Sequence, residues 1–92
     1  MNAIERSDKA RAIISSPVYE ESFDLVRNKL IIGIENCPVS DVAMAEDFRK
    51  CLKLLKAVRA NLETAINTGK LEQFRLDELE KRKKNPLRGI FR

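Results

Sequence analysis

The chain has 92 residues, of which 43% are apolar and 35% charged, and its formal net charge is +4. This length allows one domain with a small core, and apolar residues mixed with charges and few aromatics favour an all-α fold over a β-sandwich or a disordered chain. Because the chain lacks His and any glycine-rich phosphate loop, we expect no catalytic, metal or cofactor site, no small-molecule ligand and no enzyme activity.

The N-terminal segment MNAIERSDKARAIISS carries acidic residues and no long apolar run, so we expect neither a secretory signal nor a membrane anchor. The longest apolar stretch, LIIGI, is also far shorter than the roughly twenty residues that a membrane span requires. A short amphipathic helix is predicted over residues 3–15, because isoleucine and alanine recur there among charges.

Residues 17–36 are predicted to form a second helix. Ser16 stands at its N-cap, and Pro17 at the first helical position favours a helix start. Pro38 should end the helix, because the residue before a proline avoids helical geometry. Apolar residues recur along this helix every three or four positions: Tyr19, Phe23, Val26, Leu30, Ile34 and Cys37.

A third helix is predicted over residues 41–68, capped by Ser40 or Asp41, with Gly69 as its left-handed C-cap. Because only about four or five residues join it to the preceding helix, the two must lie antiparallel as a helical hairpin. Its apolar series alternates steps of four and three: Met44, Phe48, Cys51, Leu55, Val58, Leu62 and Ala65. Further apolar residues widen this series on one side: Ala45, Leu52 and Ile66.

Cys37 and Cys51 are expected to be free thiols that pack as small buried hydrophobes in a reducing compartment. Cys51 should lie about ten residues into its helix, roughly 15 Å from the turn that holds Cys37. That separation exceeds the limit of about 7 Å between the Cα atoms of a disulfide. We therefore expect no bond between them.

The second helix carries more apolar residues than one hairpin can bury. Leu25 and Ile32 lie seven positions apart on a flanking line, and Ile31 lies on another side. Gly33 costs about 1 kcal/mol relative to Ala in mid-helix, unless another backbone approaches closely. Either the N-terminal helix covers this surface or another molecule does. We expect a homo-oligomer, or docking on a larger protein, through Leu25, Ile31 and Ile32.

Residues 1–69 are predicted to be the hairpin domain, and residues 70–92 a basic C-terminal extension. The domain holds ten basic and ten acidic residues, whereas the extension holds eight basic and four acidic residues. Residues 70–84 can form a mostly solvated helix, and every charge after Glu80 is positive.

The tail KRKKNPLRGIFR allows three interpretations: a solubilising end, a nucleic-acid arm with weak, salt-sensitive affinity, or a docking peptide. As a docking peptide, it would place Leu87, Ile90 and Phe91 in a pocket of the partner. Arg88 and Arg92 would reach acidic groups at the rim of that pocket. The predicted partner-binding residues are Lys81, Arg82, Lys83, Lys84, Pro86, Leu87, Arg88, Ile90, Phe91 and Arg92.

Three stretches, ARAIISSPVYEESFDLVRNKLI, CPVSD and FRKCLKLLKAVRANLETAINTGKL, resemble small helical-hairpin proteins encoded among the virion genes of tailed bacteriophages. The resemblance covers about residues 10–71. It implies a non-enzymatic protein of the virion or the bacterial host cytoplasm, whose partner is a capsid, portal or tail protein. Two other functions stay open: a nucleic-acid-binding packaging or regulatory protein, and a small inhibitor of a host protein.

Overall fold

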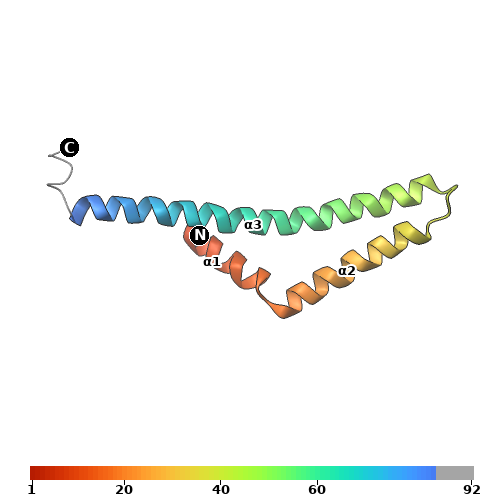
Figure 1. Cartoon of the computed structure of the whole chain (residues 1–92), viewed down its shortest axis with the longest axis horizontal. Helices are drawn as coiled ribbons and strands as arrows, with labels where there is room; N and C mark the ends of the chain where they lie inside the picture. The colour runs from red at the N-terminus through yellow and green to blue at the C-terminus, as the bar shows by residue number, and fades with distance from the viewer. Residues whose placement is uncertain (85–92) are drawn as a thin grey trace.

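A computed structural model of the chain describes residues 1–84 and places three helices in this part and no strand. They are α1 (Ala3–Ile14), α2 (Pro17–Asn36) and α3 (Val42–Lys84), and 89% of the described residues are helical. Figure 1 shows α2 and the first half of α3 as the two arms of a hairpin, with α1 returning onto the middle of α3. The predicted all-α hairpin is confirmed.

Two of the three helices begin at an N-cap residue whose side chain accepts a hydrogen bond from the backbone. Asn2 caps α1, since its side chain accepts a hydrogen bond of 2.8 Å from the backbone N–H of Glu5. Asp41 caps α3 in the same way, accepting 3.0 Å from the N–H of Met44. Ser16 occupies the predicted N-cap of α2 but makes no capping hydrogen bond, so Pro17 carries that helix start.

The predicted end of the long helix at Gly69 is wrong. Gly69 keeps helical geometry, and no glycine in residues 1–84 has a positive φ. α3 therefore continues for 43 residues to Lys84 and absorbs the separate helix predicted over 70–84. The physical reason is tertiary: Gly69 is buried where α1 crosses α3, and this contact supports a helix that Gly alone would weaken.

The molecule is elongated. Its dimensions are 73 × 27 × 19 Å and its radius of gyration is 21.5 Å. A compact domain of this length would have a radius of gyration of about 12 Å. Consequently, much of the surface of α2 and α3 is not covered by another helix of residues 1–84.

Few side chains in residues 1–84 are buried. Ala10 and Phe23 are the buried apolar residues there, and no side chain is fully enclosed. Phe23 packs against Tyr19, whose ring centre lies 6.1 Å away, and under Arg59, whose guanidinium stands 4.9 Å from the ring centre. The Tyr19 hydroxyl is buried without a hydrogen-bond partner among the described residues, which lowers stability.

The face of α3 that packs against α1 and α2 is not centred on the predicted apolar series. It is rotated toward Ala45, Leu52 and Ile66, the residues that were expected to widen that series. Half-buried positions are Ala45, Phe48, Leu52, Leu55, Arg59, Leu62, Ala65 and Ile66. Three residues of the predicted series are instead exposed: Met44, Cys51 and Val58. The rotation arises because Arg59 turns inward to cover Phe23. Both cysteines are free as predicted, but Cys51 is not buried.

Gly33 allows close approach between α2 and α3, but the approaching group is an aromatic ring and not the second backbone that the sequence analysis considered. A Cβ at Gly33 would lie 2.7 Å from Cε1 of Phe48. The absent side chain therefore lets Phe48 settle against α2, which offsets the low helix propensity of glycine.

Candidate interaction surfaces

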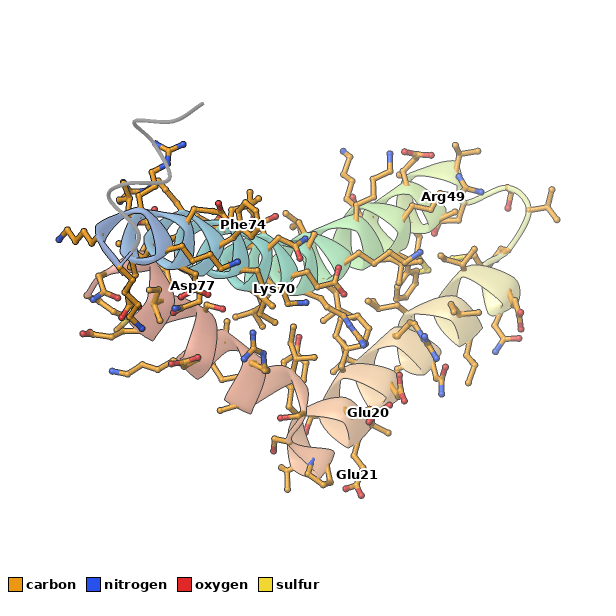
Figure 2. All side chains as sticks on the ribbon, turned by 60° about the vertical axis from the view of Figure 1, so that its left-hand side comes forward. Glu20, Glu21, Arg49, Lys70, Phe74 and Asp77 are labelled. Atoms are coloured by element: carbon orange, nitrogen blue, oxygen red, sulfur yellow. The ribbon has the colours of Figure 1, made fainter. Side chains whose placement is uncertain are left out.

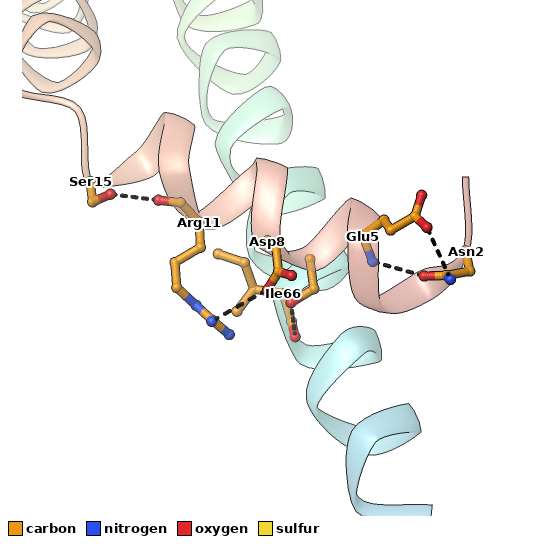
Figure 3. Close-up of polar contacts among 7 residues, drawn as sticks. Asn2, Glu5, Asp8, Arg11, Ser15 and Ile66 are labelled. Carbon is orange, nitrogen blue, oxygen red and sulfur yellow. Dashed lines mark hydrogen bonds and ion pairs between the residues drawn. The ribbon is translucent and has the colours of Figure 1, made fainter. Parts of the chain in front are cut away.

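Small residues form the contact between α1 and α3. Ser7 is buried and its hydroxyl donates a hydrogen bond of 3.2 Å to the backbone carbonyl of Ile66, drawn as a dashed line in Figure 3. A Cβ on Gly69 would lie 2.6 Å from the Ser7 hydroxyl oxygen and 2.9 Å from the carbonyl oxygen of Ala3. The sequence interpretation missed this crossing, although the spacing of Ala3, Ser7 and Ala10 places small residues on one helix face.

The three residues predicted for an oligomer surface are all exposed. The exposed fractions are 57% for Leu25, 53% for Ile32 and 37% for Ile31. α1 does not cover them, because it packs along α3 and makes few contacts with α2. Val18 is 70% exposed and continues the line of Leu25 and Ile32 at the same interval of seven. This outer line of α2 has no partner within the described chain.

A second set of exposed apolar residues lies along α3. Leu54 is 68% exposed and Val58, one turn later, is 58% exposed. Val58 also lines an apolar groove between α1 and α3, together with Ile13 and Leu62. Sequence reasoning had placed Val58 inside the hairpin and had not singled out Leu54.

The opposite side of α1 borders a groove that contains charges. Asp8 and Arg11 of α1 line it, and Lys70 and Asp77 of α3 face them across the crossing. Figure 2 labels Lys70, Phe74 and Asp77 on this stretch of α3. Since its charges are of both signs, the groove offers no uniform field for a charged ligand.

The last turn of α3 contains four of the predicted partner-binding residues: Lys81, Arg82, Lys83 and Lys84. Cations are favoured at this end of a helix by the helix dipole. All four are exposed. Nζ of Lys81 lies 3.5 Å from Oε1 of Glu78, and Nζ of Lys84 lies 3.4 Å from Oε1 of Glu80. The other predicted partner-binding residues lie outside the described residues and stay predictions: Pro86, Leu87, Arg88, Ile90, Phe91 and Arg92.

The ion pairs in residues 1–84 join residues three or four positions apart on the surface of one helix. The pKa of Glu72 is lowered mainly because Arg75 donates hydrogen bonds to its carboxylate, at 2.6 and 3.1 Å. No group of three or more His, Cys, Asp or Glu in this part of the chain is arranged to hold a metal ion. None of the described helices contains a stretch apolar enough to cross a membrane.

The chain matches no known protein family, and neither curated proteins nor solved structures include a significant match to it. The resemblance to phage virion proteins therefore stays a hypothesis.

Proposed function

We propose that this chain is a non-enzymatic interaction protein that associates with itself and serves as a component of a larger assembly. The observation that supports this most strongly is the imbalance between buried and exposed apolar residues. In residues 1–84 only Ala10 and Phe23 form a buried apolar core, whereas large apolar side chains are exposed along all three helices. Such surfaces are characteristic of proteins that bind other proteins.

The energetics favour association. Burying one Leu, Ile or Val side chain contributes roughly 1.5–3 kcal/mol. Residues such as Leu25, Ile31 and Ile32 would each contribute about one-third to one-half of that amount, because this is the fraction that is still exposed. Within the single chain these side chains stay in contact with water, so their burial stabilises the protein only when another molecule covers them.

The assembly that we propose is a phage particle or one of its intermediates, with a capsid, portal or tail protein as partner. The support for this part is the sequence resemblance alone. In this proposal the protein acts in the virion or in the host cytoplasm, and the tail residues Leu87, Ile90 and Phe91 tether it to its partner.

One observation favours a second candidate, a nucleic-acid-binding accessory protein. The last turn of α3 presents Lys81, Arg82, Lys83 and Lys84 on an exposed helix end. Two of these cations already lie beside carboxylates, and residues 1–69 carry no net charge. We therefore rank this function second, because nucleic-acid-binding domains normally present a broader basic face.

Solution mass of the full chain tests the proposal. We expect light scattering after gel filtration to give at least twice the mass of the single chain, with the larger species increasing with concentration. A DNA titration at two salt concentrations tests the alternative, which requires binding that weakens steeply as salt rises. A single-chain mass at every concentration, together with salt-sensitive DNA binding, would reverse the ranking.

A further inference from the structure

Two residues on α3 project from the side of the hairpin. Leu54 and Val58 are separated by four positions and so lie one above the other on the helix surface. Cys51 precedes Leu54 by three positions and is exposed on the same side. This line flanks the half-buried line through Leu55 and Leu62, so it lies at the border of the contacts with α1 and α2.

The surface beside this line is hollowed and apolar. A groove of about 390 Å³ runs between α1 and α3, with Ala10, Ile13, Val58 and Leu62 in its walls and Met1 at its edge. Ile13 also lines a second groove at the turn between α1 and α2. The Ile13 side chain therefore separates two neighbouring grooves.

The exposed apolar side chains of this surface, which we call the apolar face, are Met1, Ile13, Met44, Cys51, Leu54 and Val58. Together they offer roughly 320 Å² of apolar area, taking about 100 Å² for a fully exposed aliphatic side chain. Since apolar atoms make up only a little over half of an ordinary interface, the full contact would reach roughly 560 Å² on each molecule. The total of roughly 1,100 Å² for the two molecules exceeds the threshold of about 1,000 Å² for a specific interface.

We propose that the apolar face binds the same face of a second copy of this chain, in a two-fold symmetric dimer. This inference rests on the self-association proposed above and specifies where it occurs. Each copy presents a projecting side chain, Leu54, and a groove beside Val58 and Leu62 that can receive one. In a two-fold symmetric dimer, Leu54 of each copy enters the groove of the other, so both side chains and both grooves are buried.

The symmetry fixes the register of the two α3 helices. Leu54 and Leu62 lie four positions on either side of Val58, so Leu54 meets Leu62 of the second copy when the helices cross antiparallel at Val58. In that register Cys51 lies opposite Ala65 of the second copy, a pairing of two small side chains. Val58 meets Val58 at the axis.

Charges at the edge of the apolar face suit this register. Asp47 is exposed one turn before Cys51, and the register places it opposite Gly69 of the second copy. Gly69 packs against Ser7, so this is the end of α1 that carries Arg6 and Lys9. An acidic residue of each copy thus approaches two basic residues of the other, which favours this orientation over a parallel one.

Substitution of Leu54 tests the apolar face directly. In sedimentation equilibrium on the full chain, Leu54→Lys should raise the dimer dissociation constant at least about tenfold, since it places a cation in a groove that Arg6 and Lys9 also line. Leu71→Lys is the matched control, because Leu71 is 71% exposed, lies on the same helix and points to a different side. It should change the constant less than about twofold, and circular dichroism should show both variants fully helical.

A cross-link tests the axis. Val58→Cys, in a chain with Cys37→Ser and Cys51→Ser, should form a covalent dimer under mild oxidation, because the two copies of residue 58 adjoin. Lys56→Cys in the same background lies on another side of α3 and should stay mostly uncross-linked. Equal cross-linking of the two variants would overturn the proposed axis.

The outcomes separate this inference from the proposed function. A wild-type chain that is monomeric at every concentration would overturn self-association and the apolar face together. An oligomer that Leu54→Lys leaves intact but Ile32→Lys dissociates would support self-association through the outer line of α2. In that case only the assignment of the apolar face would be wrong.

Discussion

Ser7 and Gly69 meet at the point where α1 crosses α3, and the fit there leaves no room for a methyl group. Gly69→Ala should destabilise the protein by about 1–3 kcal/mol, because the added Cβ would push Ala3 and Ser7 of α1 away from α3. This loss outweighs the gain of about 1 kcal/mol that Ala brings to an open helix. Urea unfolding at fixed protein concentration measures the difference.

The neighbouring Thr68 supplies the control, since it is exposed. Thr68→Ala should alter stability by less than about half a kcal/mol. If Gly69→Ala instead stabilised the protein, α1 would not pack against this position in solution.

Leu55 and Lys56 are adjacent in sequence but lie on different faces of α3. Leu55 is half-buried in the line that meets α2, whereas Lys56 is exposed. Leu55→Ala should cost about 2 kcal/mol, the low end for a leucine truncation, because the site is only partly enclosed. Lys56→Ala should cost less than about half a kcal/mol. Equal shifts of the thermal unfolding midpoint would contradict the assigned face.

At the scale of single elements, the starts of α2 and α3 depend on different residues. Asp41→Ala should cost about 1 kcal/mol, because it removes the hydrogen bond to the N–H of Met44. Ser16→Ala should be nearly neutral, since the Ser16 side chain makes no capping bond. Chemical denaturation of the two variants provides the comparison, and a larger loss for Ser16→Ala would show that the caps are assigned wrongly.

The C-terminal part of α3 is supported by pairs on its own surface, and one of them should respond to pH. Arg75 lowers the pKa of Glu72 below its ordinary value of 4.5. The pair therefore stabilises the helix fully above pH 4.5, and this contribution is lost as the pH falls through the lowered pKa. NMR chemical shifts of residues 72–78 should show less helix on acidification.

Glu72→Gln provides the control for this pH response. It cannot form the ion pair, so at neutral pH it should already show the local loss, with a smaller further change on acidification. An equal acid response in both proteins would assign the effect to other carboxylates.

At the scale of the whole molecule, the tail should contribute to binding and not to folding. If it docks through its apolar residues, Phe91→Ala should weaken association with a partner or particle by more than about 1 kcal/mol. Changing Lys83 and Lys84 together to Gln should weaken this association less than Phe91→Ala does. Nucleic-acid binding would reverse this order, because cations would then supply the affinity. Co-sedimentation with particles and DNA titration measure the two cases.

Truncation after Glu80 is the matching test on stability. It removes exposed cations of the last turn together with residues 85–92, so the melting temperature should stay nearly unchanged at fixed protein concentration. Unfolding of the truncated chain would show that the tail belongs to the fold, and the docking proposal would lose its basis.

The amino-acid sequence by itself determined the helices and most of their boundaries. Pro17, Pro38 and Asp41 act locally, through a fixed φ, a missing donor and a capping oxygen, so their effects could be predicted without knowing what packs nearby. The same is true of the antiparallel hairpin, because a short connection leaves two long helices no other arrangement. Nothing local identified a partner for the tail or for the exposed faces.

Only the tertiary structure decided which faces those helices bury. Gly69 is a helix end on local grounds, yet α3 continues through it because Ser7 packs there. Arg59 is a surface residue by its charge, yet it turns inward over Phe23 and leaves Val58 exposed. Both outcomes depend on contacts between residues more than 30 positions apart in sequence, and helical periodicity, which relates only neighbouring turns, carries no information about them.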